Sequence, residues 1–274
     1  MKKRYFSSIS SENFKNIESP LNIHDVKDSW EEMPKNPDFN SLDEETKDSL
    51  LTWSKNGYAI IKGFFSEQEV NSYNEEIENL IENKKVKYRY GNKIMFAIHY
   101  SDILRNTGNN KKLLKILKLL MGKRVELFQS INFLKGSQQR THSDSIHMTT
   151  FPYGNLIAVW IALEDISEEC GPLNYYPGSH KLPYIMNRDY DNIGSRFRLG
   201  NKTYSEYEDY IERIVVKNRL EKKVFTAIKG DILIWHANLL HGGNKVIDKN
   251  SSRKSMVFHY YSDNSTLFNL LSSD

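Results

Sequence analysis

Hydrophobic residues in the first half of the chain recur at helical spacing. In one stretch they follow three- and four-residue steps, which places them along one face of an α-helix: Val70, Tyr73, Ile77, Leu80 and Ile81. Ser41-x-x-Glu44 and Ser66-x-x-Glu69 have the spacing of a capping box, in which a hydroxyl and a carboxylate bind backbone amides at a helix start. We therefore expect helices after Ser41 and after Ser66, and a third over residues 111–121 that ends at Gly122.

After residue 123 the hydrophobic period changes to two, which is typical of a β-strand over residues 125–134. Alternation divides this strand into one face with Val125, Leu127, Gln129, Ile131 and Phe133, and another with Glu126, Phe128, Ser130, Asn132 and Leu134. Further strands are expected over residues 58–65, 142–150, 156–163, 173–176, 224–228, 232–236 and 253–262.

These elements predict a mainly β protein with flanking helices, an α+β chain. Most of the strands after residue 123 have no helix between them, which favours an antiparallel barrel or a jelly roll, the cupin-like double-stranded β-helix, over alternating βαβ units. Residues 1–40 read as an arm that covers the domain or is partly disordered, and residues 41–274 as one domain. A helix is expected over residues 204–220, inside an insertion of about residues 182–223, where Ser205-x-x-Glu208 has the spacing of a helix start.

Composition excludes several classes of protein. The chain of 274 residues has 39% hydrophobic residues, 16 Tyr and 13 Phe, which indicates a globular protein rather than a disordered one. The longest apolar run, residues 156–163, is too short for a membrane span. A net charge of +3 with interleaved signs does not indicate nucleic-acid binding, so we expect a small-molecule partner. A single cysteine, Cys170, and the absence of a secretory signal pattern at the N-terminus agree with a cytoplasmic protein. The oligomeric state is left open.

A candidate metal site comes from the histidines. In His142-Ser-Asp144 the two outer side chains would point to the same face of a strand. His241 follows another predicted strand, at a turn that could aim it inward. Two histidines and one carboxylate on one side of a metal leave the opposite positions open, as non-haem Fe(II) oxygenases require. His-x-Asp alone is also common in ordinary turn and hydrogen-bond contacts, so this pattern needs further support.

Arg253-Lys-Ser255 supplies that support. Alternation places Arg253 and Ser255 on one face of the last long strand, and a guanidinium beside a hydroxyl suits a buried carboxylate. By contrast, His236 and Trp235 stand in an apolar run and are interpreted as core residues.

Several segments, taken together, resemble the phytanoyl-CoA dioxygenase family of Fe(II)- and 2-oxoglutarate-dependent oxygenases. They occur in family order: Tyr58-Ala-Ile-Ile-Lys-Gly-Phe-Phe-Ser66, His142-Ser-Asp144, Val159-Trp-Ile-Ala-Leu-Glu-Asp165, Gly171-Pro-Leu, Pro177-Gly-Ser-His-Lys181, Gly230-Asp-Ile-Leu-Ile-Trp-His236, His241-Gly and Arg253. The resemblance implies that His142, Asp144 and His241 ligate iron.

The same resemblance implies the remaining contacts of the site. Arg253, with Ser255, would hold the distal carboxylate of the co-substrate 2-oxoglutarate, and Trp160 would line its pocket. Gln129-Ser-Ile-Asn132 looks like the strand that in ectoine hydroxylases contacts 2-oxoglutarate and substrate, which would assign those roles to Asn132 and Gln129, although this segment is one residue shorter here.

The implied reaction consumes dioxygen and 2-oxoglutarate, releases succinate and carbon dioxide, and hydroxylates an unactivated C–H bond. The intact carboxylate of Asp144 favours hydroxylation over halogenation, because halogenating relatives have a small residue there. The insertion at residues 182–223 contains several tyrosines and arginines and is expected to cover the site as a lid, which suits a polar or anionic substrate. Two alternatives stay open: a metal-dependent cupin-like isomerase or hydrolase, and a non-catalytic relative that binds a ligand.

Overall fold

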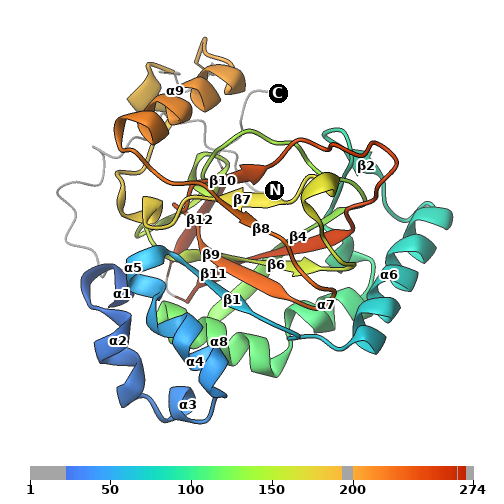
Figure 1. Ribbon diagram of the computed structural model, residues 1–274, viewed down its shortest axis with the longest axis horizontal. Coiled ribbons are helices and arrows are strands. Elements are labelled where there is room, and N and C mark those ends of the chain that lie inside the picture. The colour runs from blue at the N-terminus through green and yellow to red at the C-terminus, as the bar shows by residue number, and fades with distance from the viewer. Residues whose placement is uncertain (1–22, 193–199, 264, 270–274) are drawn as a thin grey trace.

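A computed structural model describes residues 23–192, 200–263 and 265–269 of the chain. The first 22 residues of the expected N-terminal arm, and part of the expected insertion, lie outside the described residues. The remaining part of the arm, residues 23–40, is helical, and its Met33 and Phe39 are buried against the main core. This part of the arm is therefore a folded layer of the structure (Figure 1).

The strands form one large sheet and two small ones. Their bounds are β1 Tyr58–Ile61, β2 Tyr88–Arg89, β3 Lys93–Met95, β4 Val125–Phe133, β5 Met148–Phe151, β6 Leu156–Ala162, β7 Leu173–Tyr175, β8 Lys223–Phe225, β9 Ile232–His236, β10 His241–Gly243, β11 Ser255–Ser262 and β12 Thr266–Asn269. The large sheet has the order β1-β9-β6-β11-β4-β3-β2, and the small sheets are β10-β7-β8 and β12-β5. All strand pairings in the described part of the chain are antiparallel, which confirms the predicted jelly-roll core with flanking helices.

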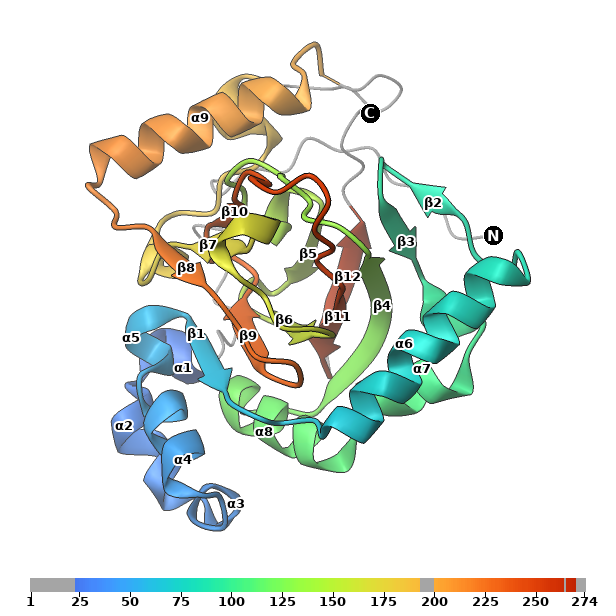
Figure 2. The ribbon, with the colours of Figure 1, turned by 45° about the vertical axis from the view of Figure 1, so that its right-hand side comes forward.

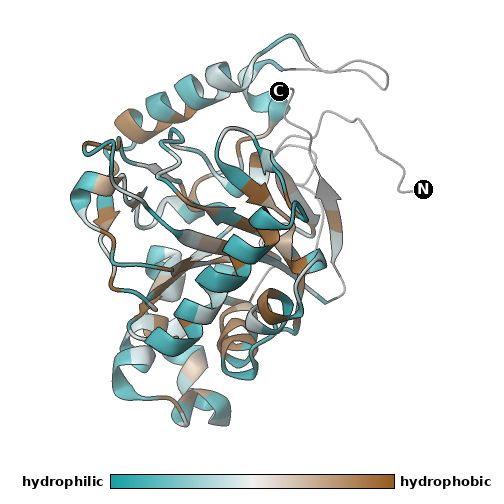
Figure 3. Cartoon of the chain, turned by 90° about the vertical axis from the view of Figure 1, so that its right-hand side faces the viewer, coloured by the Kyte–Doolittle hydropathy of each residue, from teal (hydrophilic) through white to brown (hydrophobic). Residues whose placement is uncertain are grey.

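The helices pack mainly on the outer face of the large sheet. Their bounds are α1 Ile23–Val26, α2 Ser29–Glu32, α3 Pro37–Asn40, α4 Glu44–Leu51, α5 Trp53–Asn56, α6 Glu67–Glu82, α7 Asp102–Gly108, α8 Lys111–Met121 and α9 Tyr204–Lys217. Figure 2 shows α6, α7 and α8 outside the curved sheet, with β7, β8 and β10 facing its inner side and α9 apart from the other helices. Figure 3 shows hydrophobic residues gathered in the strands and hydrophilic ones along the outer helices.

Two hydrophobic clusters occupy the two faces of the large sheet. Helix residues such as Ile77 and Leu117 pack with Ile157 and Phe258 on the outer face. Trp160, Leu233 and Val257 pack with residues of the small sheet on the inner face. Because strand residues alternate between these faces, β6 and β9 are buried on both sides, which explains their continuous apolar sequences.

A β-bulge changes the predicted faces of β4. The pairing of β11 with β4 shifts between His259 and Tyr260, which leaves Phe128 as an extra residue. Leu127 therefore packs with the helix-side cluster, whereas Ile131 packs with the inner one. The expectation that residues 125–133 keep one alternation was wrong for this reason.

Some helix ends lie where the sequence predicted them, and two helix starts do not. Helix α6 begins with the predicted box of Ser66 and Glu69, and α8 ends at Gly122 in the left-handed conformation. Helix α4, however, is capped by Asp43, whose side chain accepts a hydrogen bond from the Thr46 amide. Helix α9 is capped by Thr203, so the capping residues expected at Ser41 and Ser205 were each wrong by two positions. No helix in the described part of the chain is long and apolar enough to cross a membrane.

The packing of α8 gives a stability prediction. Leu117 is fully buried, so Leu117→Ala should lower the free energy of unfolding by about 2–5 kcal/mol, because it leaves a cavity between helix and sheet. Leu114→Ala, at a partly buried position of the same helix, is the matched control and should cost clearly less. Urea denaturation measures both, and equal losses would contradict the packing described here.

Buried histidines at the end of β9 predict acid sensitivity. Burial lowers the pKa of His236 to about 4, below the ordinary value near 6.5 in an unfolded chain. The unfolded state therefore takes up this proton first, and stability that is complete above pH 6.5 is lost as the pH falls toward 4. Between pH 7 and pH 5, His236 should lower the free energy of unfolding of the wild type by about 2 kcal/mol, and His236→Asn should lack this contribution. Urea denaturation at the two pH values measures it. Substitution of the exposed His99 should leave that loss unchanged.

Candidate active site

Three buried side chains converge inside the jelly roll. One ligand atom from each of His142, Asp144 and His241 lies within 4.8 Å of those of the other two, and all three residues are buried. They come from two segments, one that precedes β5 and one that opens β10, next to the inner face of the large sheet. The structure thus brings together the three residues that the sequence singled out.

A β-bridge outside the regular strands holds two of the three side chains side by side. The amide of His142 donates to the carbonyl of His241 and the reverse bond also forms, each at 2.9 Å. The strand expected over residues 142–150 starts only at Met148, because Asp144 opens a short 3-10 turn. The backbone at Ser143 is nevertheless extended, so His142 and Asp144 still project to the same side.

Each histidine is oriented by its own backbone. Nδ1 of His142 lies 2.8 Å from the carbonyl oxygen of Arg140, and Nδ1 of His241 lies 3.0 Å from that of Leu239. A carbonyl accepts only, so each Nδ1 carries the proton and donates it. Each Nε2 is left with a free lone pair, which is the form in which histidine binds a metal.

Asp144 is held from the opposite side by Trp235. The indole Nε1 donates to Oδ2 of Asp144 at 2.8 Å, and the indole ring also lies 4.8 Å from the His241 ring, centroid to centroid. Nε2 of His241 is 3.7 Å from Oδ1 of Asp144, and Nε2 of His259 is 3.6 Å from Oδ2. Trp235 was expected to be core packing alone, and its role in orienting Asp144 was missed because no local pattern shows which way an indole N–H points.

The charges of the group suit a divalent cation. Burial would raise the pKa of Asp144, but the neighbouring His241 and His259 lower it below its ordinary value, so the carboxylate is ionised at neutral pH. Burial, with His241 and His147 nearby, holds the pKa of His142 well below its usual range, so the imidazole is neutral. Two imidazoles with one carboxylate are a donor set that fits non-haem iron.

A buried guanidinium without an acidic partner lies on the same inner face. Arg253 is 3% exposed, its Nη1 donates to Oγ of Ser255 at 2.8 Å, and its Nε has no hydrogen-bond partner. Among the described residues, no carboxylate forms an ion pair with it. Burial lowers the pKa of Arg253 to about 10, so it is still a cation at neutral pH. An unpaired buried charge is costly, and this one is ready to receive an anion.

A second cation faces the same ring as Arg253. The Arg253 guanidinium carbon lies 5.2 Å from the centroid of Phe133, and Nζ of Lys93 lies 5.9 Å from it. Lys93 donates to Oε1 of Gln139 at 2.8 Å, and no described carboxylate pairs with it. Burial lowers the pKa of Lys93. Lys93 was not singled out from the sequence, because only the pairing of β3 with β4 places it beside Phe133.

The register of the strands shows on which face of the large sheet the other predicted contact residues lie. Trp160 pairs with Val257 on the inner face, and the centroid of its ring lies 5.9 Å from the Arg253 guanidinium carbon. Gln129 pairs with His259 on the same face, and its Oε1 is buried without a partner.

The structure contradicts the role that was expected of Asn132. It pairs with Met256 and Ile94, which pack in the helix-side cluster, so its amide lies on the outer face of the sheet. The expected contact of Asn132 with 2-oxoglutarate is not compatible with this register.

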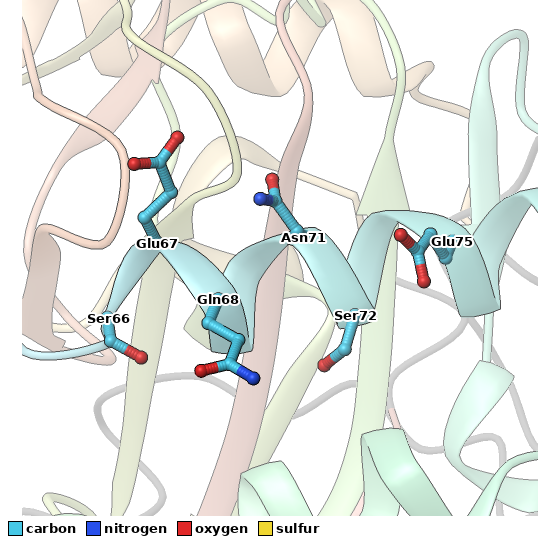
Figure 4. A pocket seen from close by; sticks show the side chains of 6 residues that line it. All are labelled: Ser66, Glu67, Gln68, Asn71, Ser72 and Glu75. Carbon is cyan, nitrogen blue, oxygen red and sulfur yellow. The ribbon is translucent and has the colours of Figure 1, made fainter.

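A separate polar pocket lies on the outer side of α6. Its lining consists of Ser66, Glu67, Gln68, Asn71, Ser72 and Glu75, all from this helix and its N-cap (Figure 4). It shares no residue with the group around Asp144 and contains no histidine or arginine, so it does not belong to the candidate active site.

Comparison with known proteins agrees with the geometry. The family described as phytanoyl-CoA dioxygenase (PhyH) matches residues 53–255. A phytanoyl-CoA dioxygenase domain-containing protein 1 from Danio rerio is 27% identical over 185 residues, which are 65% of this chain and 59% of that protein. The match therefore spans about three fifths of the zebrafish relative.

Two solved structures share the fold. The non-heme alpha ketoglutarate dependent carbocyclase SnoK from nogalamycin biosynthesis has a TM-score of 0.67 and 18% identity, covering 84% of this chain and 88% of that one. EctD from S. alaskensis with 2-oxoglutarate and 5-hydroxyectoine has a TM-score of 0.61 and 18% identity, covering 77% and 74%. The matched residues 53–255 include His142, Asp144 and His241, and also Arg253 and Ser255. The chain belongs to the phytanoyl-CoA dioxygenase family.

Proposed function

We propose that this protein is an Fe(II)- and 2-oxoglutarate-dependent dioxygenase in which His142, Asp144 and His241 bind the iron. The observation that carries the proposal is the buried, unpaired guanidinium of Arg253 on the same inner face as the three ligands. A metal site for hydrolysis or isomerisation would need a second, buried anion site only if its substrate were an anion, whereas a 2-oxoglutarate-dependent oxygenase needs one for its co-substrate. The family match and the solved relatives with 2-oxoglutarate support the same assignment.

The charges of the site match a dicarboxylate. Arg253 and the Ser255 hydroxyl would bind the distal carboxylate of 2-oxoglutarate, because a guanidinium offers two parallel N–H donors to one carboxylate. Lys93 would add a second positive charge beside Phe133. When bound, iron, 2-oxoglutarate and dioxygen supply oxidising chemistry that releases succinate and carbon dioxide.

The protein's own residues then orient the reactants and exclude water. The hydrogen bonds of Nδ1 in both histidines and of Oδ2 in Asp144 leave both Nε2 atoms and Oδ1 for the metal. Trp160, Val257 and Leu233 form the apolar inner wall. Such preorganisation keeps the reacting groups in place and the site dry.

For the substrate we propose a small polar molecule whose C–H bond is hydroxylated. The intact carboxylate of Asp144 supports hydroxylation over halogenation, as argued from the sequence. The insertion at residues 182–223 would act as a lid, since α9 lies against the segment that carries His142 and Asp144. The polarity of this segment supports a polar substrate, and a screen for substrate-dependent succinate release would identify it.

The co-substrate site is tested first by spectroscopy. Anaerobic addition of Fe(II) and 2-oxoglutarate should give the weak visible charge-transfer band of the chelate. His142→Ala should abolish the band because one ligand is lost. Arg253→Ala should lose a buried charge-assisted contact to 2-oxoglutarate. The 2-oxoglutarate concentration that gives half of the maximal band intensity should therefore rise at least about 10-fold.

The exposed Arg124 provides the control for loss of positive charge. Arg124→Ala should titrate like the wild type. A wild type that binds metal but never develops the band would reject 2-oxoglutarate as the co-substrate and favour the isomerase, hydrolase or pure binding alternatives, with zinc as the next metal to test.

The contact between Trp235 and Asp144 gives a second test. Trp235→Phe keeps an aromatic ring but removes the N–H that holds Oδ2, so Asp144 is less well oriented. Metal affinity should fall about 10-fold, the lower end of what loss of such a contact to a metal ligand costs. Titration with Co(II) measures it, and Trp53→Phe, a buried tryptophan in the helix-side cluster, is the matched control. Equal affinities of the two variants would show that the indole N–H does not support the metal site.

A further inference from the structure

Helix α9 contacts the metal-binding segment at several points. Arg140, two residues before His142, pairs with Asp209 at 2.6 Å and with Glu212 at 2.9 Å. Tyr204, at the start of the helix, lies 3.0 Å from Nε2 of His147 through its hydroxyl. The ion pairs are exposed and contribute little by themselves. Together with the contact of Tyr204, they nevertheless show that α9 runs along the segment from Arg140 to His147, which contains His142 and Asp144.

The most direct contact is made by Tyr207. This residue is fully buried, and its hydroxyl accepts a hydrogen bond from the backbone amide of Ser143 at 3.2 Å and lies 3.3 Å from Oγ of Ser143. Ser143 is the residue between His142 and Asp144. The hydroxyl of a residue in the insertion is thus bonded to the peptide that joins two of the three ligands.

The three consecutive amides of this segment have different partners. The amide of His142 donates to the carbonyl of His241, and that of Asp144 donates to the carbonyl of Ala237. The amide of Ser143 points the other way and donates to the Tyr207 hydroxyl. A buried amide without a partner is unfavourable, so the extended backbone at Ser143 depends on α9 being in place.

Apolar packing connects α9 to both metal-binding segments as well. Tyr207 and Ile211 pack in one cluster with Ile146 and Leu240. Ile146 lies two residues after Asp144, and Leu240 directly precedes His241. Movement of α9 away from the core would therefore disturb the surroundings of both segments at once.

We propose that Tyr207 is a positioning residue for the metal site and that docking of α9 and metal binding are coupled through it. The proposal rests on the metal site of the proposed function. Because such coupling is reciprocal, a docked α9 strengthens metal binding and bound metal strengthens the docking of α9. In this proposal, helix α9 completes the geometry of the segment that carries His142 and Asp144.

The structure offers a closely matched control in Tyr190. This tyrosine is also buried, packs 5.5 Å from Tyr207 between ring centroids, and uses its hydroxyl in hydrogen bonds with Asn187 and Asn192. Those bonds stay within the insertion and do not reach the metal-binding segment. Tyr190→Phe and Tyr207→Phe therefore remove the same group from the same cluster, and only the second disconnects Ser143.

The first measurement is Co(II) affinity of the full chain by absorption titration. Tyr207→Phe should weaken Co(II) binding about 10-fold, in the range for loss of an outer contact to metal ligands, whereas Tyr190→Phe should bind like the wild type. Equal Co(II) affinity in both variants, with a wild type that binds, would overturn the coupling and leave the proposed function standing. A wild type that does not bind Co(II) or Fe(II) would overturn both.

The second measurement needs no variant and covers the case in which Tyr207→Phe fails to fold. Hydrogen exchange of the α9 amides, residues 204–217, should slow when Co(II) is added to the wild type. Unchanged exchange in α9 on saturation with Co(II) would overturn the coupling, because reciprocal stabilisation is then absent.

Discussion

The β-bridge between His142 and His241 is the interaction on which the rest of the site depends. It joins a segment that is not part of a regular strand to the start of β10, and so brings together two ligands almost one hundred residues apart. The same pattern recurs on both sides of the bridge, since each imidazole donates through Nδ1 to the carbonyl two residues earlier. One backbone contact thus fixes the position of both histidines, and two local bonds fix their orientation.

Much of the fold was readable from the sequence because β6, β9 and β11 follow simple rules. Their apolar runs are long enough to be strands, and the absence of helices between most neighbours leaves few topologies. The errors arose where a nearby residue, one or two positions away, took over a role or changed the strand geometry that a local sequence rule assumes. Asp43 and Thr203 cap their helices in place of the serines, and the bulge at Phe128 reverses the face of everything beyond it.

The residues of the candidate site that were predicted from sequence also differ from those that were missed in whether a local pattern marks them. The residues found from sequence, His142, Asp144, His241 and Arg253, belong to short motifs whose spacing carries chemical meaning. The contacts that were missed, those of Trp235, Lys93 and Tyr207, are made between elements far apart in the chain. Their identity depends on register and on which way an N–H or O–H points, and neither leaves a pattern in a single sequence.

The inner face of the sheet also limits what can bind there. The site combines one ionised carboxylate, Asp144, with one buried cation that has no ion pair among the described residues, Arg253, and the partly buried Lys93 lies beside the same ring as Arg253. The guanidinium of Arg253 has lost its hydration, so a neutral ligand beside it would leave its charge uncompensated. A dicarboxylate would offset the charge of a bound metal with one end and that of the guanidinium with the other. The charges of the site therefore favour a dicarboxylate beside the metal, independently of the identity of the substrate that reacts next to it.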